Sequence, residues 1–286
     1  MAPPAESTPV AWQPPSNSLL WQDGLWRSAT VSPVSYPDVA NEVCFQVEDG
    51  SYWFRHRMDC LLATFGHFPP AGTIYDIGGG NGFVALALQT AGREVALLEP
   101  GSGARNALRR GVRHVIQATL EDACFRGHSL PAAGAFDVIE HIADDAAFLR
   151  NIREQLIPGG RFYCTVPAAA SLWSEADLQA GHYRRYSRRT LGATLAQAGF
   201  TVEFASYFFA WLTLPIAVLR ALPSRLGLRN QAFAGNPAAI PAEHRLPTRF
   251  TGLVSRAQAW ELDRLRTRRP LPFGTSLLCV ARANDS

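Results

Sequence analysis

Short apolar runs and amphipathic segments alternate through the middle of the chain. The runs have the length of buried strands and occupy residues 73–77, 94–98, 114–117, 132–136 and 161–166. Apolar residues recur at helical spacing in the segments between them, over 82–91, 102–110 and 145–156. This β-α-β rhythm requires right-handed crossovers and a mainly parallel sheet with helices on both faces. We therefore expect an α/β, Rossmann-like fold.

Patterns at both ends of this core predict its boundaries. A helix over 187–198 and strands at 200–205 and 275–282 bring the expected sheet to seven strands. A further helix over 51–68 carries apolar residues on one face and ends before Pro69, while residues 19–49 are aromatic and irregular. The expected organisation is a disordered lead-in (1–18), an N-terminal cap (19–70), a core (71–206), an insertion or lid (207–270), and a last core strand with a tail (271–286).

The insertion begins with an apolar stretch that has no charged residue from Phe204 to Leu219. A membrane-spanning helix needs roughly 20 apolar residues, and Pro215 interrupts this stretch, so we do not expect it to cross a membrane. Three roles remain, namely an apolar lid, an oligomer contact such as a homodimer interface, or a helix on a membrane surface. The flanking Arg220 and Arg225 favour peripheral membrane contact.

Composition excludes several classes of chemistry. All 27 cationic side chains are arginine, which rules out Schiff-base catalysis by lysine and a Walker A phosphate loop. A net charge of +3 is small for a nucleic-acid partner, and we interpret the arginine clusters at 184–189 and 245–269 as solvated surface. The five cysteines are odd in number and form no CxxC pair, which favours reduced thiols in a cytoplasmic protein.

The strongest chemical signal is the segment D-I-G-G-G-N-G at residues 76–82, between a predicted strand and a predicted helix. Such a glycine-rich turn lets a ligand approach the backbone closely, and the helix start supplies free N–H groups. Glu99 ends the next strand nineteen residues after Gly80, where an acid can accept hydrogen bonds from both ribose hydroxyls. The order D-x-G-x-G-x-G differs from the G-x-G-x-x-G fingerprint of dinucleotides, so an NAD-binding oxidoreductase is the weaker alternative.

A third segment, Phe136-Asp137-Val138-Ile139-Glu140-His141, follows the fourth strand at the sheet edge where ligands bind. Together these motifs resemble the class I S-adenosylmethionine (SAM)-dependent methyltransferase family, particularly its ubiquinone-biosynthesis-like branch, which commonly has G-C-G-T-G in the turn and D-x-x-E-H after strand four. The resemblance covers roughly Tyr52 to Ala205 and the last strand. It implies SAM as cofactor, S-adenosylhomocysteine as product and a small-molecule acceptor.

The resemblance also implies roles for individual residues. The methionine end of SAM would lie against Asp76, Gly78 and Gly80, within a turn that Asn81 and Gly82 complete. Glu99 would hold the ribose beside Pro100, and Thr119 and Leu120 would flank the adenine. Many relatives have Asp at the position of Thr119, so this contact departs from the pattern of the family. Tyr52 and Arg57 would fold over the cofactor from the N-terminal helix, while Phe136 and Asp137 would border the site.

Two histidines are candidates for catalysis. His141 can accept a proton near neutral pH because the unperturbed pKa of histidine is about 6.5, although relatives often use this histidine to support the cofactor pocket. His182 follows the fifth strand, and beside it Tyr183, Arg184 and Tyr186 could bind an aromatic or acidic acceptor or simply shape the loop. We interpret four other histidines as surface residues, namely His67, His114, His128 and His244. They have no acidic or cysteine companions at metal-ligand spacing, so we expect no metal.

The acceptor is the least determined part of this prediction. We favour O- or N-methylation of a secondary metabolite, with a lipid-linked or glycolipid intermediate at a membrane surface as the alternative. An RNA acceptor would call for a broader positive face, or for an N/D-P-P-Y/F motif after the fourth strand, where Phe136-Asp137-Val138-Ile139 stands instead. We therefore expect no nucleic-acid partner.

Overall fold

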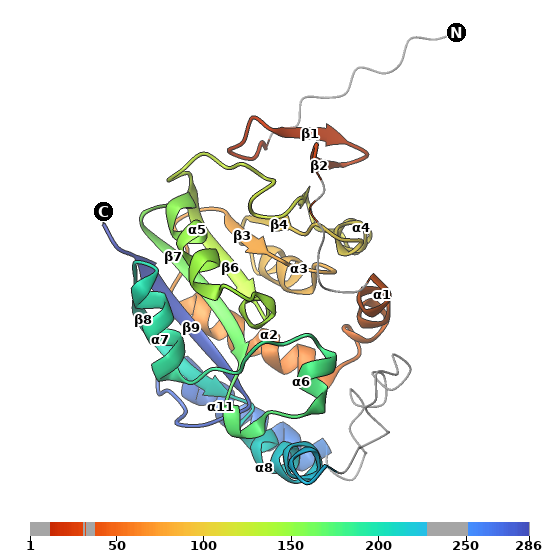
Figure 1. Cartoon of the computed structure of the whole chain (residues 1–286), viewed down its shortest axis with the longest axis vertical. Helices are drawn as coiled ribbons and strands as arrows, with labels where there is room; N and C mark the ends of the chain where they lie inside the picture. Colours follow the sequence, from red (N-terminus) through yellow and green to blue (C-terminus); the bar gives the residue numbers. More distant parts are fainter. Residues whose placement is uncertain (1–11, 31, 33–37, 228–250, 286) are drawn as a thin grey trace.

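The computed structural model describes residues 12–30, 32, 38–227 and 251–285. Within these ranges the strands form one sheet in the order β1-β2-β5-β4-β3-β6-β7-β9-β8 (Figure 1). Its parallel centre consists of β3 (Ile74–Ile77), β4 (Val95–Leu98), β5 (His114–Gln117), β6 (Leu130–Phe136) and β7 (Leu156–Pro167). At one edge β9 (Ser276–Ala283) runs antiparallel between β7 and β8 (Phe200–Phe208). The predicted α/β, Rossmann-like fold is confirmed.

Helices cover both faces of the sheet because residues of the central strands alternate between two cores. Ile74 packs with the face that carries α2 (Tyr52–His67), α3 (Phe83–Thr90) and α4 (Gly103–Arg110). Tyr75 and Ile77 pack on the other face, with α5 (Asp145–Gln155) and α7 (Arg188–Gln197). Alternate residues of a strand point to opposite faces, so this short strand anchors both layers.

Two strands were missed in the sequence, so the expected count of seven was wrong. β1 (Leu19–Gln22) and β2 (Leu25–Ser28) form an antiparallel hairpin, and β2 pairs parallel to β5 through Trp26 and Ile116. The hairpin turn is Asp23-Gly24, where both residues have positive φ, 53° and 83°. Asp-Gly is the favoured sequence for this kind of turn, and it was present in a segment that we expected to be irregular.

Other parts of the N-terminal region are also more regular than predicted. Trp12 lies within the predicted lead-in, yet it stacks on His114 with ring centroids 4.3 Å apart and packs against the core. Residues 1–11 lie outside the described residues. A helix, α1 (Asp38–Val47), precedes α2 and packs near α4. β7 already begins at Leu156, so residues 157–160, between the predicted helix over 145–156 and the predicted strand over 161–166, lie inside a strand with an irregular register.

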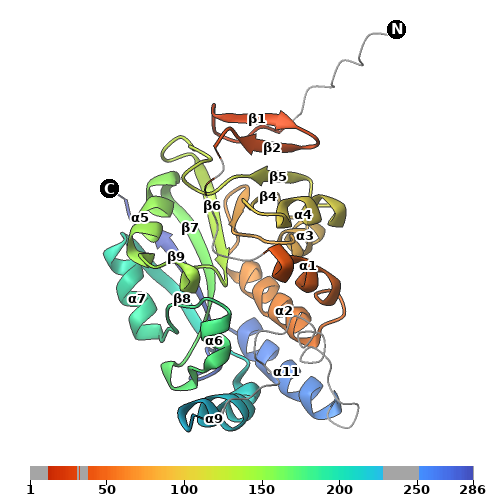
Figure 2. The ribbon, with the colours of Figure 1, turned by 45° about the vertical axis from the view of Figure 1, so that its right-hand side comes forward.

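The insertion folds back onto the cap. After β8 the chain forms η3 (Ala210–Leu212), α8 (Thr213–Ile216), the π-helical turn η4 (Ala217–Ala221) and α9 (Leu222–Arg225), and it returns as α11 (Thr251–Arg266). Helix α11 lies alongside α2 (Figure 2). His244 and the first part of the predicted arginine cluster at 245–269 lie in 228–250, outside the described residues. Among the helices described, none has the length and apolar character required to cross a membrane.

One buried carboxylate joins the cap to the insertion. Glu261 of α11 is fully buried and accepts hydrogen bonds from the backbone N–H groups of Phe209 and Ala210, at 2.9 and 2.6 Å. Its Oε2 also lies 2.9 Å from Nε2 of the buried His56 on α2. A side chain that satisfies three buried partners fixes the position of α2 relative to the insertion.

Candidate functional site

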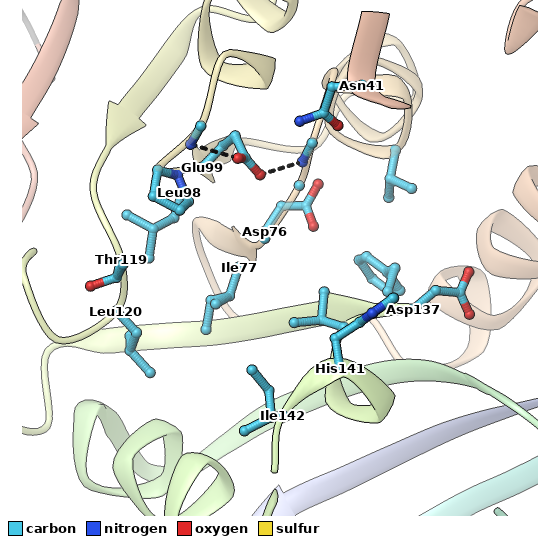
Figure 3. Close-up of a pocket in the computed structure, with 18 of the residues that line it drawn as sticks. Asn41, Asp76, Ile77, Leu98, Glu99, Thr119, Leu120, Asp137, His141 and Ile142 are labelled. Carbon is cyan, nitrogen blue, oxygen red and sulfur yellow. Dashed lines mark hydrogen bonds between the residues drawn. The ribbon is translucent and has the colours of Figure 1, made fainter. Parts of the chain in front are cut away.

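A pocket of about 960 Å³ opens at the carboxyl ends of the central strands (Figure 3). It is the edge at which open α/β sheets bind ligands. Thirteen of the predicted site residues line it, namely Arg57, Asp76, Gly78, Gly80, Asn81, Glu99, Pro100, Thr119, Leu120, Phe136, Asp137, His141 and His182. The fold therefore brings together side chains that are more than a hundred positions apart in the sequence.

The glycine turn and Glu99 are joined by hydrogen bonds. Oε2 of Glu99 accepts from the N–H of Gly80 at 3.0 Å, and Oε1 accepts from the N–H of Gly101 at 2.8 Å (Figure 3). A carboxylate has about four acceptor positions, and Glu99 lies in the pocket wall. Such a carboxylate suits a vicinal pair of hydroxyls.

Only glycine fits at two positions around this turn. Gly80 has a φ of +51°, a conformation that side chains rarely adopt. A Cβ on Gly103, at the start of α4, would lie 2.7 Å from the carbonyl oxygen of Gly80. The backbone of the turn is thus held between Glu99 and the next helix.

Asp76 is a buried acid that faces the pocket from β3. Burial, with a smaller contribution from the nearby Glu99, raises the pKa of Asp76 to about 7, although Arg57 acts in the opposite direction. Its Oδ2 has no hydrogen-bond partner among the described residues. A buried acceptor without a donor is costly, so this oxygen is well suited to a cationic N–H group of a ligand.

The end of the pocket at Thr119 and Leu120 is less polar than the end at Asp76 and Glu99. Thr119 and Leu120 follow β5 and lie across the pocket from Asp137 (Figure 3). The Thr119 hydroxyl already accepts a hydrogen bond from the N–H of Asp122 at 3.0 Å, and Leu120 is buried. This end presents mainly apolar surface to a flat ring, and the threonine hydroxyl helps to hold its own turn.

Asn81 has a role that the sequence did not predict. Its side-chain amide donates to the backbone oxygen of Asn41 at 2.8 Å and to Glu48 at 3.4 Å, and its oxygen accepts from Asn106 at 3.0 Å. Glu48 in turn forms an ion pair with Arg110 at 2.8 Å. The side chain of Asn81 therefore fastens α1 over the glycine turn, a contact that we had not anticipated from its place in the motif.

Arg57 connects the cap helix to the sheet. Its Nη2 lies 2.6 Å from Oδ2 of Asp137 and donates to the Thr165 hydroxyl at 3.3 Å. Asp137 has a φ of +59°, and its Oδ1 accepts from the same hydroxyl at 3.1 Å. This network places the buried guanidinium of Arg57, paired with Asp137, in the wall of the pocket.

The other wall carries two histidines. The rings of His141 and His182 lie 4.8 Å apart between centroids, and Nδ1 of His182 lies 3.0 Å from Oδ1 of Asp177. Burial, and then the neighbouring His182, lower the pKa of His141 to about 4. The ring is neutral at pH 7, but a group with so low a pKa is a weak proton acceptor, which disfavours the predicted role of His141 as general base.

Five predicted residues do not line the pocket. Tyr183 is exposed, Arg184 forms an ion pair with Asp145 at 3.0 Å, and the buried Tyr186 donates to the same carboxylate at 2.7 Å. Arg184 and Tyr186 thus hold the loop after β7 to α5, and acceptor binding by the three residues stays a prediction. Tyr52 packs near Trp211 instead, and Gly82 starts α3 with a φ of +76°.

Several lining residues were missed in the sequence. They come from α1 and the residue after it, α2, the turn before α5 and α5 itself, and comprise Asn41, Cys44, Glu48, Trp53, Ile142, Asp144, Phe148 and Asn151. Phe54 also lines the pocket, from the helix that we expected to fold over the cofactor, and the helical spacing within 51–68 was a usable signal for Trp53. No local pattern distinguishes the α1 residues, since they reach the pocket only through the contact of α1 with the glycine turn.

Comparisons with known proteins agree with this geometry. The family model described as "Methyltransferase domain" matches residues 52–204. The "Probable S-adenosylmethionine-dependent methyltransferase" of Mycolicibacterium smegmatis is 26% identical over 180 residues, covering 60% of this chain and 68% of that protein. The "Ubiquinone biosynthesis O-methyltransferase" of Methylobacterium sp. is 32% identical over 105 residues, covering 33% of this chain and 41% of that protein.

A solved structure shares the fold. It is a chain from the complex between a methyltransferase and a methyltransferase activator of Haloferax volcanii, with a TM-score of 0.53 and 19% identity. The similarity covers 86% of this chain and 96% of that chain. At this level of identity the match concerns the arrangement of strands and helices.

Proposed function

Because the chain belongs to the class I SAM-dependent methyltransferase family, we propose that it transfers the methyl group of SAM to an oxygen or nitrogen atom of a small molecule. SAM is the cofactor of this family, and it supplies a methyl group on a positively charged sulfur when it is bound. The residues of this chain then have three tasks, which are to align donor and acceptor, exclude water and provide for the acceptor's proton.

The cofactor half of the pocket suits SAM in its polar groups. We propose that Glu99 accepts hydrogen bonds from the ribose hydroxyls and that Asp76 accepts one from the ammonium group. Gly78 and Gly80 leave room for the amino-acid end, while Leu120 packs on the adenine. The orphaned Oδ2 of Asp76 is the single observation that carries this assignment, since a buried acid of this kind needs a cationic donor.

The acceptor half lies beside Arg57, His141 and His182. We propose that the acceptor enters between these groups, so that its nucleophilic atom faces the methyl carbon in line with the sulfur. With SAM bound, the acceptor atom would form its bond to the methyl carbon, the electron pair of the carbon–sulfur bond would stay on sulfur, and the proton of the acceptor's O–H or N–H group would leave to water. The apolar side chains of Trp53 and Phe54 line the pocket and limit the access of water to the reacting atoms.

Transfer of a labelled methyl group tests this function. Purified protein is incubated with SAM labelled in the methyl group and with small-molecule extracts of the source organism, and products are identified by mass. The expected result is a labelled small molecule whose mass exceeds that of its precursor by one methyl group. Absence of any labelled product, together with calorimetric heat for NAD and none for SAM, would contradict the proposal.

A lipid-linked acceptor is a second candidate because the insertion exposes apolar side chains. Leu214, Val218 and Leu222 are 72%, 51% and 52% exposed; Arg220 lies between the last two in the sequence, and Arg225 follows them. An apolar face with adjacent cations is typical of a helix on an anionic membrane surface. Sedimentation with anionic and neutral vesicles distinguishes this candidate from a homodimer contact, which light scattering would detect without lipid.

A further inference from the structure

Three side chains of the acceptor wall could bind one metal ion. Glu140, His141 and His182 each offer a ligand atom, and these atoms all lie within 4.8 Å of one another. In a tetrahedral zinc site, with bonds of about 2.1 Å, neighbouring ligand atoms are about 3.4 Å apart. Both histidines line the pocket and are only half-buried, so small shifts of the three side chains can close this difference while the hydrogen bonds of the rings are kept.

The histidines are oriented in the manner of metal ligands. Nδ1 of His182 is engaged with Asp177, which leaves Nε2 as the ring nitrogen that can take an ion. The ring of His141 is held by a hydrogen bond with the backbone of Gly181. Metal-bound histidines commonly bond a carboxylate or a backbone carbonyl through their second nitrogen, which fixes the ring for the ion.

The charges around Glu140 do not balance. Arg57 is paired with Asp137, and Arg185 donates to Asp177 at 2.8 Å. Glu140 is 1% exposed, no ion pair reaches it within the described part of the chain, and its Oε2 has no hydrogen-bond partner there. A buried carboxylate without a cation is strongly disfavoured, and a divalent ion would supply the missing charge.

We propose that Glu140, His141 and His182 bind a divalent transition-metal ion of the zinc type beside the acceptor. Two imidazoles and one carboxylate are a ligand set that catalytic zinc sites use, with a further position left for a substrate oxygen. The expectation of no metal rested on other histidines and did not consider this pair, whose members are 41 positions apart.

This inference deepens the proposed function, and its chemical part rests on that function. An ion at this place would hold an acceptor through oxygen and make loss of its hydroxyl proton easier. The proton leaves to water, because both imidazoles are occupied as ligands. The oxygen–carbon bond then forms as the carbon–sulfur bond breaks, so an oxygen acceptor is favoured over a nitrogen acceptor.

Metal titration of the full-length, untagged protein tests the proposal. The protein is stripped with a chelator, titrated with Zn²⁺ by calorimetry, and separately loaded with Co²⁺ to record its visible absorption. Glu140→Gln and His182→Ala are the test variants, and His67→Gln is the matched control because His67 lies outside the pocket. SAM affinity is measured for every variant as an independent sign of an intact cofactor half.

The expected result is one Zn²⁺ per chain, at least 100-fold weaker binding in both test variants, and unchanged binding in the control. SAM affinity should stay within threefold throughout. Wild-type protein that binds no stoichiometric Zn²⁺, or test variants that retain SAM and bind Zn²⁺ like wild type, would overturn the proposal. Failure of SAM to bind while Zn²⁺ binds as expected would count against the proposed function and leave the metal site standing.

Discussion

The two halves of the pocket are built in different ways. In the cofactor half, Glu99 is bonded to two backbone N–H groups, and the turn it holds is shaped by glycines and adjacent strands. In the acceptor half, Glu140, His141 and His182 come from a short 3-10 turn and a loop after α6. The backbone of the fold thus specifies the cofactor half, while side chains on loops specify the acceptor half. A family can keep the first and vary the second.

The largest effect is expected from Glu99→Ala. Loss of two charge-assisted hydrogen bonds to the ribose should weaken SAM binding about 1000-fold, or ~4 kcal/mol. Glu94→Ala is the matched control, because Glu94 is an exposed acid at the other end of the same strand. Calorimetric titration with SAM measures the affinity of both variants. Equal affinity of Glu99→Ala and Glu94→Ala for SAM would show that Glu99 does not bind the ribose and that the cofactor half is wrongly assigned.

Glu261→Ala should affect the acceptor half through the cap. Removal of this carboxylate leaves the N–H groups of Phe209 and Ala210 buried without an acceptor, which should cost about 3 kcal/mol of unfolding free energy. Helix α2, which carries Arg57, would lose its tie to the insertion. Urea unfolding measures the loss, with Glu175→Ala on the surface as a control. An unchanged unfolding midpoint would mean that this contact does not hold the cap.

The pH dependence of SAM binding should follow Asp76, whose pKa is raised to about 7. If the ionised acid binds the ammonium group, affinity should fall by up to about tenfold per pH unit below 7. The raised pKa of Asp76 also lowers the free energy of unfolding as pH rises from about 4 to 7. The folded state binds the Asp76 proton more strongly than the unfolded state, so losing this proton favours unfolding.

Asp76→Asn separates these two effects. The variant should bind SAM weakly at every pH, and it should melt about 3 °C or more above wild type at pH 8, with little difference at pH 4. Calorimetry and thermal melts at both pH values provide the readouts. A wild-type affinity that does not change between pH 5.5 and pH 8 would argue against an ionised Asp76 as the ligand.

The smallest effect is expected from Tyr183→Ala. This side chain is 59% exposed and lies outside the pocket, so turnover and SAM affinity should change less than about twofold. Phe148→Ala, in the pocket wall, serves as the sensitive comparison and should change the apparent acceptor affinity more. A loss of acceptor binding in Tyr183→Ala would restore this tyrosine to the site.

The sequence was informative where a function depends on backbone shape. The spacing of Asp76, Gly80 and Glu99 predicted that they meet in one pocket, because adjacent parallel strands end at one edge of the sheet. The sequence was uninformative where distant side chains meet. Neither the contact of Asn81 with α1 nor the buried pair of His56 and Glu261 has a local pattern.

Some features that we did not predict were indicated by patterns in the sequence. The Asp-Gly turn at Asp23 indicated the hairpin that raises the sheet to nine strands. Tyr183 and Tyr186 were assigned to the acceptor by proximity in sequence to His182. In the structure, alternate residues of that loop point to different surroundings, and one of the two tyrosines is buried while the other is exposed.

Crystals grown with S-adenosylhomocysteine test the central claim most directly. We predict that the ribose hydroxyls lie within hydrogen-bond distance of Glu99, that the ammonium group faces Asp76, and that the sulfur points toward the wall formed by His141 and His182. A nucleoside bound elsewhere, or a glycine turn left empty with Glu99 directed away from the ligand, would contradict the account.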